Sequence, residues 1–142
     1  MSRGPTWEAC LRSFWCEGRH STGMDEPLDV VPIEDDDDLY RRLFARYVKA
    51  DGSVSSAAYK DRRKKPLNKI SVDLARFSTP EETRARDDRG FRVAAVRAGA
   101  VRDLEFSVRH DPMPENFAHS LIEGENTMEK CLELATATVV VL

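Results

Sequence analysis

Apolar and polar residues alternate over several short stretches of this chain, and turn residues separate those stretches. In ISVDL the apolar Ile70, Val72 and Leu74 fall on one face, and the polar Ser71 and Asp73 fall on the other. This period of two is typical of a β-strand. The other stretches that show it are 53–59 (weakly), 92–95, 106–109 and 118–122. The pattern predicts a sheet of four or five strands.

A spacing of four residues predicts a first helix. Leu39, Leu43 and Tyr47 recur every four residues in DLYRRLFARYV, which indicates a helical stripe. Tyr40 and Phe44 lie beside them, and aromatic residues also favour strands. A strand is therefore the alternative for this stretch.

A capping signal predicts a second helix. Thr79 occupies the N-cap position, Pro80 the first helical position and Glu82 the position three residues after the cap, which together form a capping box. We expect this helix to be short and to end near Gly90, since glycine readily adopts the left-handed cap conformation.

The end of the chain is expected to form a closing helix from Thr127. The side chains that it would turn inward are Met128, Cys131, Leu132, Leu134 and Ala135. Its tail, TATVVVL, is rich in β-branched residues, and a strand is the alternative there.

Taken together, these elements predict one small α+β domain over 38–142, in which two or three helices pack on a mixed sheet. Residues 1–37 are expected to form an acidic, poorly ordered leader, because prolines and the run Asp35–Asp38 disfavour compact structure. Within it, 1–23 is interpreted as an upstream extension, and Met24 as the natural start.

Charge changes this picture, because it is segregated along the chain. Residues 1–38 hold three basic and ten acidic side chains, 39–110 hold eighteen basic and nine acidic, and 111–142 hold one basic and six acidic. A basic middle is typical of a face that binds a polyanion such as nucleic acid. The alternative is that the acidic ends lie against the basic middle.

Several function classes lack their signatures. The chain has neither a secretory signal nor an apolar run of the length of about 20 residues that a bilayer span needs, and its three cysteines fit reduced thiols. A cytoplasmic location without membrane contact is therefore expected. No glycine-rich phosphate loop occurs, and no cofactor is expected. No metal site is expected either, since Cys10, Cys16 and His20 supply only three neighbouring ligands.

Two stretches carry candidate chemistry. His110 and His119 flank the proline-broken loop HDPMPENFAH, and imidazole titrates near neutral pH without tuning. The alternative is a structural turn shaped by its prolines. The basic stretch 60–69 is the candidate nucleic-acid contact, and its central cations are Arg62, Arg63, Lys64 and Lys65.

The strings LYRRLF, DGSVSSAAYK, ISVDLAR, TPEETRAR and VRHDPMPENFAHSLIEG resemble a family of small bacterial proteins without an assigned activity, over about residues 39–124. Tyr40-Arg41 and Ser55-Ser56 are also similar to positions in RES and ADP-ribosyltransferase-like toxins. The glycine-rich Trp-Asn segment of RES domains has no counterpart here.

Three functions follow as hypotheses. The first is a non-enzymatic interaction module with a protein partner, inside a larger bacterial assembly. The second is a nucleotide-handling enzyme or toxin with a cleft formed by Arg41, Ser55, His110 and His119. The third is nucleic-acid binding through the 60–69 stretch.

Overall fold

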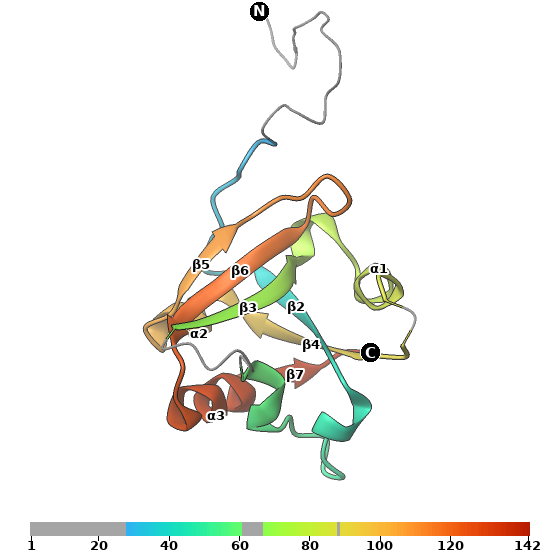
Figure 1. The fold of residues 1–142 in the computed structure, drawn as a ribbon, viewed down its shortest axis with the longest axis vertical. Coiled ribbons are helices and arrows are strands. Elements are labelled where there is room, and N and C mark those ends of the chain that lie inside the picture. The colour runs from blue at the N-terminus through green and yellow to red at the C-terminus, as the bar shows by residue number, and fades with distance from the viewer. Residues whose placement is uncertain (1–27, 61–66, 88) are drawn as a thin grey trace, which may run out of the picture.

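The computed structural model describes residues 28–60, 67–87 and 89–142 (Figure 1). Its strands are β2 Asp38–Leu43, β3 Leu67–Leu74, β4 Arg92–Arg97, β5 Ser107–His110, β6 His119–Glu125 and β7 Val139–Val140. Its α-helices are α1 Pro80–Ala85, α2 Ala98–Asp103 and α3 Met128–Thr136. Short 3-10 helices occupy Ala45–Tyr47, Ser56–Tyr59 and Ala75–Phe77.

The strands form one sheet in the order β5-β6-β3-β2-β4-β7, and every described pairing is antiparallel. The α+β class with three α-helices agrees with the prediction. The prediction of a mixed sheet with four or five strands is wrong, because the described residues form a sheet of six antiparallel strands. Within 53–59, which is weakly predicted as a strand, Val54 forms an isolated bridge and Ser56–Tyr59 form a 3-10 helix. In contrast, β2 and the short β7 are strands in stretches where a helix is the first prediction.

The stretch predicted as the first helix is strand β2. A spacing of four is even, so Leu39 and Leu43 lie on one face of a strand as well as on one face of a helix. Both side chains are almost fully buried in the sheet. The first helix prediction is therefore wrong, and its strand alternative is confirmed for Asp38–Leu43, whereas Ala45–Tyr47 form a short 3-10 helix.

One face of the sheet is the hydrophobic core. Residues paired across an antiparallel ladder point to the same face, so Leu74 lies with Leu39, and Ile70 lies with Ile122. Helix α3 covers this face with Cys131, Leu134 and Ala135. The opposite face carries Ser71, Asp73 and His119, and α1 lies on that face, because its Thr83 bonds to Asp73.

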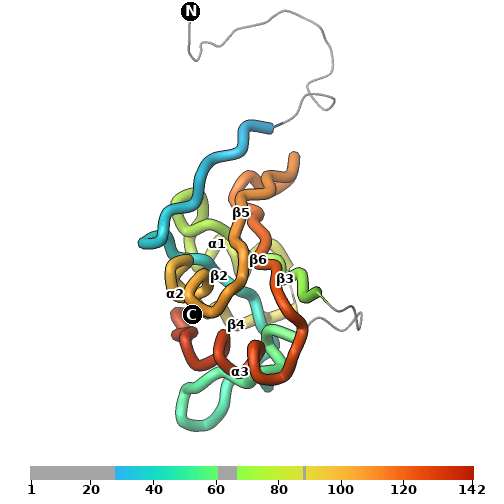
Figure 2. Tube along the Cα trace, turned by 90° about the vertical axis from the view of Figure 1, so that its left-hand side faces the viewer, coloured from blue at the N-terminus to red at the C-terminus, as the bar shows by residue number. Residues whose placement is uncertain are grey.

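The described residues before β2 lie against the domain. Figure 2 shows segment 28–37, in blue, running beside β5 toward β2. The Val31 amide donates to His110 Nδ1 at 3.0 Å, Asp35 pairs with Arg102 of α2, and Ile33 is buried in the core. The boundary at residue 38 stays a prediction, while this segment contributes one core side chain.

Candidate functional site

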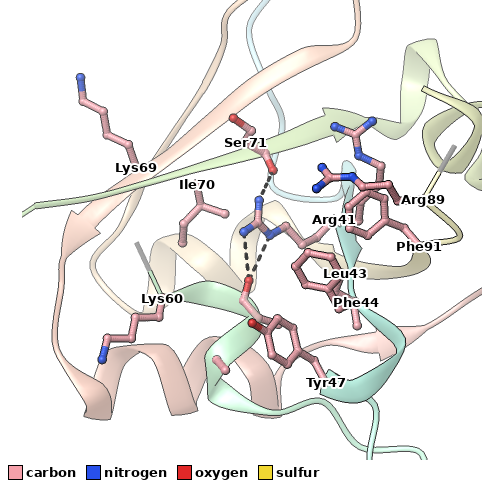
Figure 3. A pocket seen from close by; sticks show the side chains of 13 residues that line it. Arg41, Leu43, Phe44, Tyr47, Lys60, Lys69, Ile70, Ser71, Arg89 and Phe91 are labelled. Atoms are coloured by element: carbon pink, nitrogen blue, oxygen red, sulfur yellow. Dashed lines mark hydrogen bonds between the residues drawn. The ribbon is translucent and has the colours of Figure 1, made fainter. Parts of the chain in front are cut away.

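Strands β2 and β3 pair over only two positions, Leu39 with Leu74 and Tyr40 with Asp73. Beyond them Arg41 occupies the gap between the strands (Figure 3). Its Nη1 donates to the Ser71 carbonyl at 2.9 Å, and its Nε and Nη2 donate to the Ala58 carbonyl at 3.1 and 3.0 Å. The guanidinium thus donates hydrogen bonds to backbone carbonyls at a place where β2 and β3 no longer pair. Its planar, forked set of N–H groups can reach both carbonyls at once.

A cleft of about 490 Å³ opens beside Arg41. We call it the basic cleft, because five cationic residues line it and no acidic residue does, within the part of the chain that the structure describes. The cations are Arg41, Arg42, Lys60, Lys69 and Arg89. Aromatic side chains complete the wall, namely Phe44, Tyr47 and Phe91.

Two of these cations form ion pairs with carboxylates of the described residues. Arg89 forms bonds of 3.0 and 2.8 Å to the two oxygens of Asp87, and these hydrogen bonds hold the Asp87 pKa at about 2, so that the carboxylate stays ionised at neutral pH. Lys69 lies 3.8 Å from Glu123. No described carboxylate forms an ion pair with Arg42 or Lys60, so the cleft keeps a positive charge.

The aromatic wall is a connected cluster. The rings of Phe44 and Phe91 lie 5.0 Å apart, and those of Phe44 and Tyr47 lie 5.7 Å apart. The Arg46 guanidinium lies 4.4 Å from the Phe44 ring centre, within cation–π range. The rings therefore pack against one another along this wall.

A second cleft, of about 680 Å³, lies on the α1 side of the sheet. We call it the His119 cleft. Its lining includes Arg42, Ser71, Arg86, Asn116 and His119. Since Arg42 and Ser71 line both clefts, the two clefts are neighbours.

A buried carboxylate holds the walls of the His119 cleft in place. Asp73 accepts hydrogen bonds from Thr83 Oγ1 at 2.9 Å, Arg86 Nε at 2.8 Å and Asn116 Nδ2 at 2.8 Å. Thr83 and Arg86 come from α1 and the turn after it, whereas Asn116 comes from the loop between β5 and β6. One side chain of β3 therefore fixes both walls.

The four residues predicted for a toxin-like cleft separate into different settings. Arg41 lines the basic cleft and His119 the second cleft, and both contact Ser71. Ser55 caps the helix Ser56–Tyr59 and lines neither cleft. His110 is buried, with Nδ1 accepting from Val31 and Nε2 donating to the Phe117 carbonyl at 2.6 Å. The toxin-like activity stays a prediction without a shared cleft to support it.

Other predicted features fall partly outside the described residues. Arg62, Arg63, Lys64 and Lys65 lie there, as do Cys10, Cys16 and His20. Among the described residues, no three His, Cys, Asp or Glu side chains are grouped as metal ligands. None of the described helices is long and apolar enough to cross a membrane. Cys131, predicted to be a core residue, is buried, and burial raises the pKa of its thiol.

Comparisons with known proteins give no relative. No protein-family model, no curated protein and no solved structure matches this chain. The two family resemblances of the sequence therefore stay predictions.

Sequence reasoning did not single out Arg42 or Arg89. Nothing in their local sequence distinguishes them from the other arginines of a basic region. Only the departure of β2 from β3 brings Arg42 beside Lys69, and only the chain path after α1 brings Arg89 to the same cleft.

The contacts of Arg41 predict a structural cost on substitution. We expect Arg41→Lys to lower the free energy of unfolding by about 2 kcal/mol, since an ammonium cannot reproduce a forked pattern of charge-assisted hydrogen bonds. Urea unfolding measures this change. Arg46→Lys, at an exposed position stacked on Phe44, is the control and should change stability by less than about 0.5 kcal/mol. Equal values for the two variants would contradict the role given to Arg41.

Proposed function

We propose that this protein is an interaction module that binds a phosphate-bearing polyanion in the basic cleft, with single-stranded nucleic acid as the ligand class. The observation that carries the proposal is the lining of that cleft by five cations and by no described acidic residue. Clefts lined by charge of one sign concentrate the opposite charge. Phosphate groups of a nucleic-acid backbone are ligands of that kind.

Single strands fit this cleft because cations and aromatic rings share it. Phe44 and Tyr47 are half-buried and keep part of their surface accessible. Proteins that bind single strands combine a basic groove with rings on which bases stack. The basic stretch 60–69 begins and ends at this cleft, because its first residue, Lys60, and its last basic residue, Lys69, both line it. The four central cations of the stretch lie between these two lysines in the sequence.

The test is binding of a fluorescent oligothymidylate, followed by anisotropy over a salt series. We expect Arg42→Ala/Lys60→Ala to weaken binding about tenfold or more at low salt. The slope of log affinity against log salt should fall by about 0.7 for each phosphate that the variant no longer neutralises. Arg42 and Lys60 are chosen because they form no ion pair with a described carboxylate, so their removal leaves no unpaired acid.

The control variant also removes two positive charges, at positions outside both clefts. Arg84 and Arg97 are exposed and line neither cleft, so Arg84→Ala/Arg97→Ala should bind nearly as the wild type does. Equal weakening by both double variants would show that net charge alone drives binding and would overturn the proposal. A further variant with Arg62, Arg63, Lys64 and Lys65 replaced by alanine tests the 60–69 stretch separately, and unchanged binding would exclude these four cations as contacts.

A protein partner remains the second candidate. Met128 and Leu132 lie one turn apart on α3 and are 65% and 52% exposed. Larger contiguous apolar patches mark protein–protein interaction sites, and these two side chains would form part of such a patch. They support the accessory role without naming the partner.

A further inference from the structure

Three side chains on the open face of the sheet form a chain of short contacts. Ser71 Oγ lies 3.3 Å from His119 Nε2. On the other side of the ring, His119 Nδ1 lies 3.2 Å from Asp111 Oδ2 and 2.9 Å from the Asp111 carbonyl oxygen. A hydroxyl, an imidazole and a carboxylate in this order are the parts of a Ser-His-Asp hydrolase.

Strand register produces this arrangement. Asp73 pairs with His119 and Ser71 pairs with Leu121, so Ser71 and His119 are diagonal neighbours on one face of the sheet. The Asp111 amide donates to the His119 carbonyl at 2.9 Å, which holds Asp111 opposite His119 at the end of β5. Arg41 holds the Ser71 carbonyl from the other side. Paired strands therefore position Ser71 and His119, and such positioning is more rigid than positioning by loops. Asp111 directly follows β5.

The contacts also determine which ring nitrogen carries the proton. Nδ1 faces two acceptors, the carboxylate and the carbonyl oxygen of Asp111, so the proton resides on Nδ1. Nε2 then presents its lone pair to the Ser71 hydroxyl. This is the tautomer in which histidine can remove a proton from serine.

The hydroxyl is accessible to a substrate. Ser71 is exposed, and it lines the His119 cleft together with His119, Arg42 and Arg86. Arg42 forms no ion pair with a described carboxylate and can offer positive charge to a developing oxyanion. Arg86 is paired with Asp73, and Glu82 and Glu115 also line this cleft. A cleft of about 680 Å³ accommodates a small acyl ester.

We propose that Ser71 is the nucleophile, His119 the general base and Asp111 the positioning residue of an esterase site that acts on small carboxylic esters. Ser71 Oγ bonds to the acyl carbon while its proton moves to His119 Nε2, and the π electrons of the ester carbonyl move to the carbonyl oxygen. The carbonyl then re-forms as the bond between the acyl carbon and the leaving oxygen breaks, and that oxygen takes the proton from Nε2. Water repeats the sequence on the acyl-serine: it gives a proton to Nε2, its oxygen bonds to the acyl carbon, and Ser71 leaves with the proton. The products are a carboxylic acid and an alcohol, with no other reactant.

The test uses the full chain with p-nitrophenyl acetate and with a fluorophosphonate that labels activated serines. We expect one covalent adduct per chain, mapped by mass spectrometry to Ser71, and turnover of the ester. Ser71→Ala should abolish both. His119→Gln should slow both by about 100-fold or more, since general base catalysis contributes about 10² to 10⁴. Ser107→Ala is the matched control, because Ser107 is an exposed serine on the same face of the sheet and its hydroxyl bonds to the Glu123 carbonyl and to no described histidine.

The role of Asp111 needs a readout that a purely structural residue would not change. We expect Asp111→Asn to lower kcat about tenfold with little change in KM, and Asp111→Glu to restore part of the loss. Thermal unfolding of each variant verifies that the fold is retained. The absence of a Ser71 adduct, or labelling that His119→Gln leaves unchanged, would overturn the proposal.

This site does not depend on the polyanion proposal. Ser71→Ala keeps the carbonyl that Arg41 contacts, and it should bind the oligothymidylate as the wild type does. Esterase activity without oligonucleotide binding, or the reverse, would therefore reject one proposal and leave the other.

Discussion

Replacing Asp73 with alanine is expected to lower the free energy of unfolding by about 3 kcal/mol. Its side chain is 8% exposed and accepts bonds from Thr83, Arg86 and Asn116. Removing one partner of a buried ion pair costs about 3–5 kcal/mol, and the lower end applies because the Arg86 side chain is 27% exposed. Urea unfolding followed by circular dichroism measures the loss.

Asp38→Ala is the matched control for this variant. Asp38 lies 3.6 Å from Arg97, and both side chains are well exposed. Exposed ion pairs contribute about 0–1 kcal/mol, so the control should lose little stability. If Asp73→Ala were as stable as Asp38→Ala, Asp73 would not hold the walls of the His119 cleft.

A comparable loss, about 3 kcal/mol, is expected for Gly124→Ala. A Cβ atom at this position in β6 would lie 2.1 Å from Phe106 Cδ1 and 2.6 Å from Cε1. Phe106 is 4% exposed, so its ring cannot move aside without disturbing the core, and overpacking a core costs about 1–3 kcal/mol or more. The same unfolding measurement applies.

A double-mutant cycle tests the cause of that loss. Phe106→Ala removes the ring, so adding Gly124→Ala to it should cost little more than Phe106→Ala alone. Gly52→Ala is the control for backbone strain without a clash, since Gly52 has φ +87° and no atom lies within 4 Å of an added Cβ. We expect this variant to lower the free energy of unfolding by about 1 kcal/mol. Additive losses at Gly124 and Phe106 would mean that the clash is not the cause.

Local signals in the sequence predicted local structure well. The capping box at Thr79 is present, with Glu82 bonding back to the Thr79 amide at 3.0 Å. The strand alternation of β3, β4, β5 and β6 is confirmed as well. Such signals work because each depends on residues a few positions apart.

Signals that depend on the rest of the fold were less reliable. Helix α3 begins after Thr127 as predicted, yet Met128 and Leu132 face outward, since only one stripe of the helix contacts the sheet. The short strand β7 exists because it pairs with Ala94 and Ala95 of β4, far earlier in the chain. Neither outcome can be read from a window of neighbouring residues.

The clefts were the least predictable part. The sequence pointed to His119 and Arg41 but not to the contact that each makes with Ser71. Ser71 and His119 are 48 positions apart, and a shift of one residue between β3 and β6 would place them on opposite faces. Strand register, which depends on the whole core, therefore decides whether these groups meet.

The two-residue pairing between β2 and β3 leaves only a short hydrogen-bonded junction between strands β5-β6-β3 and strands β2-β4-β7. The basic cleft lies at that junction, with Arg42 on β2 and Lys69 on β3. A polyanion that contacts both cations would link the two groups of strands. Since such a ligand binds only the folded sheet, its binding free energy would add to the stability of the fold.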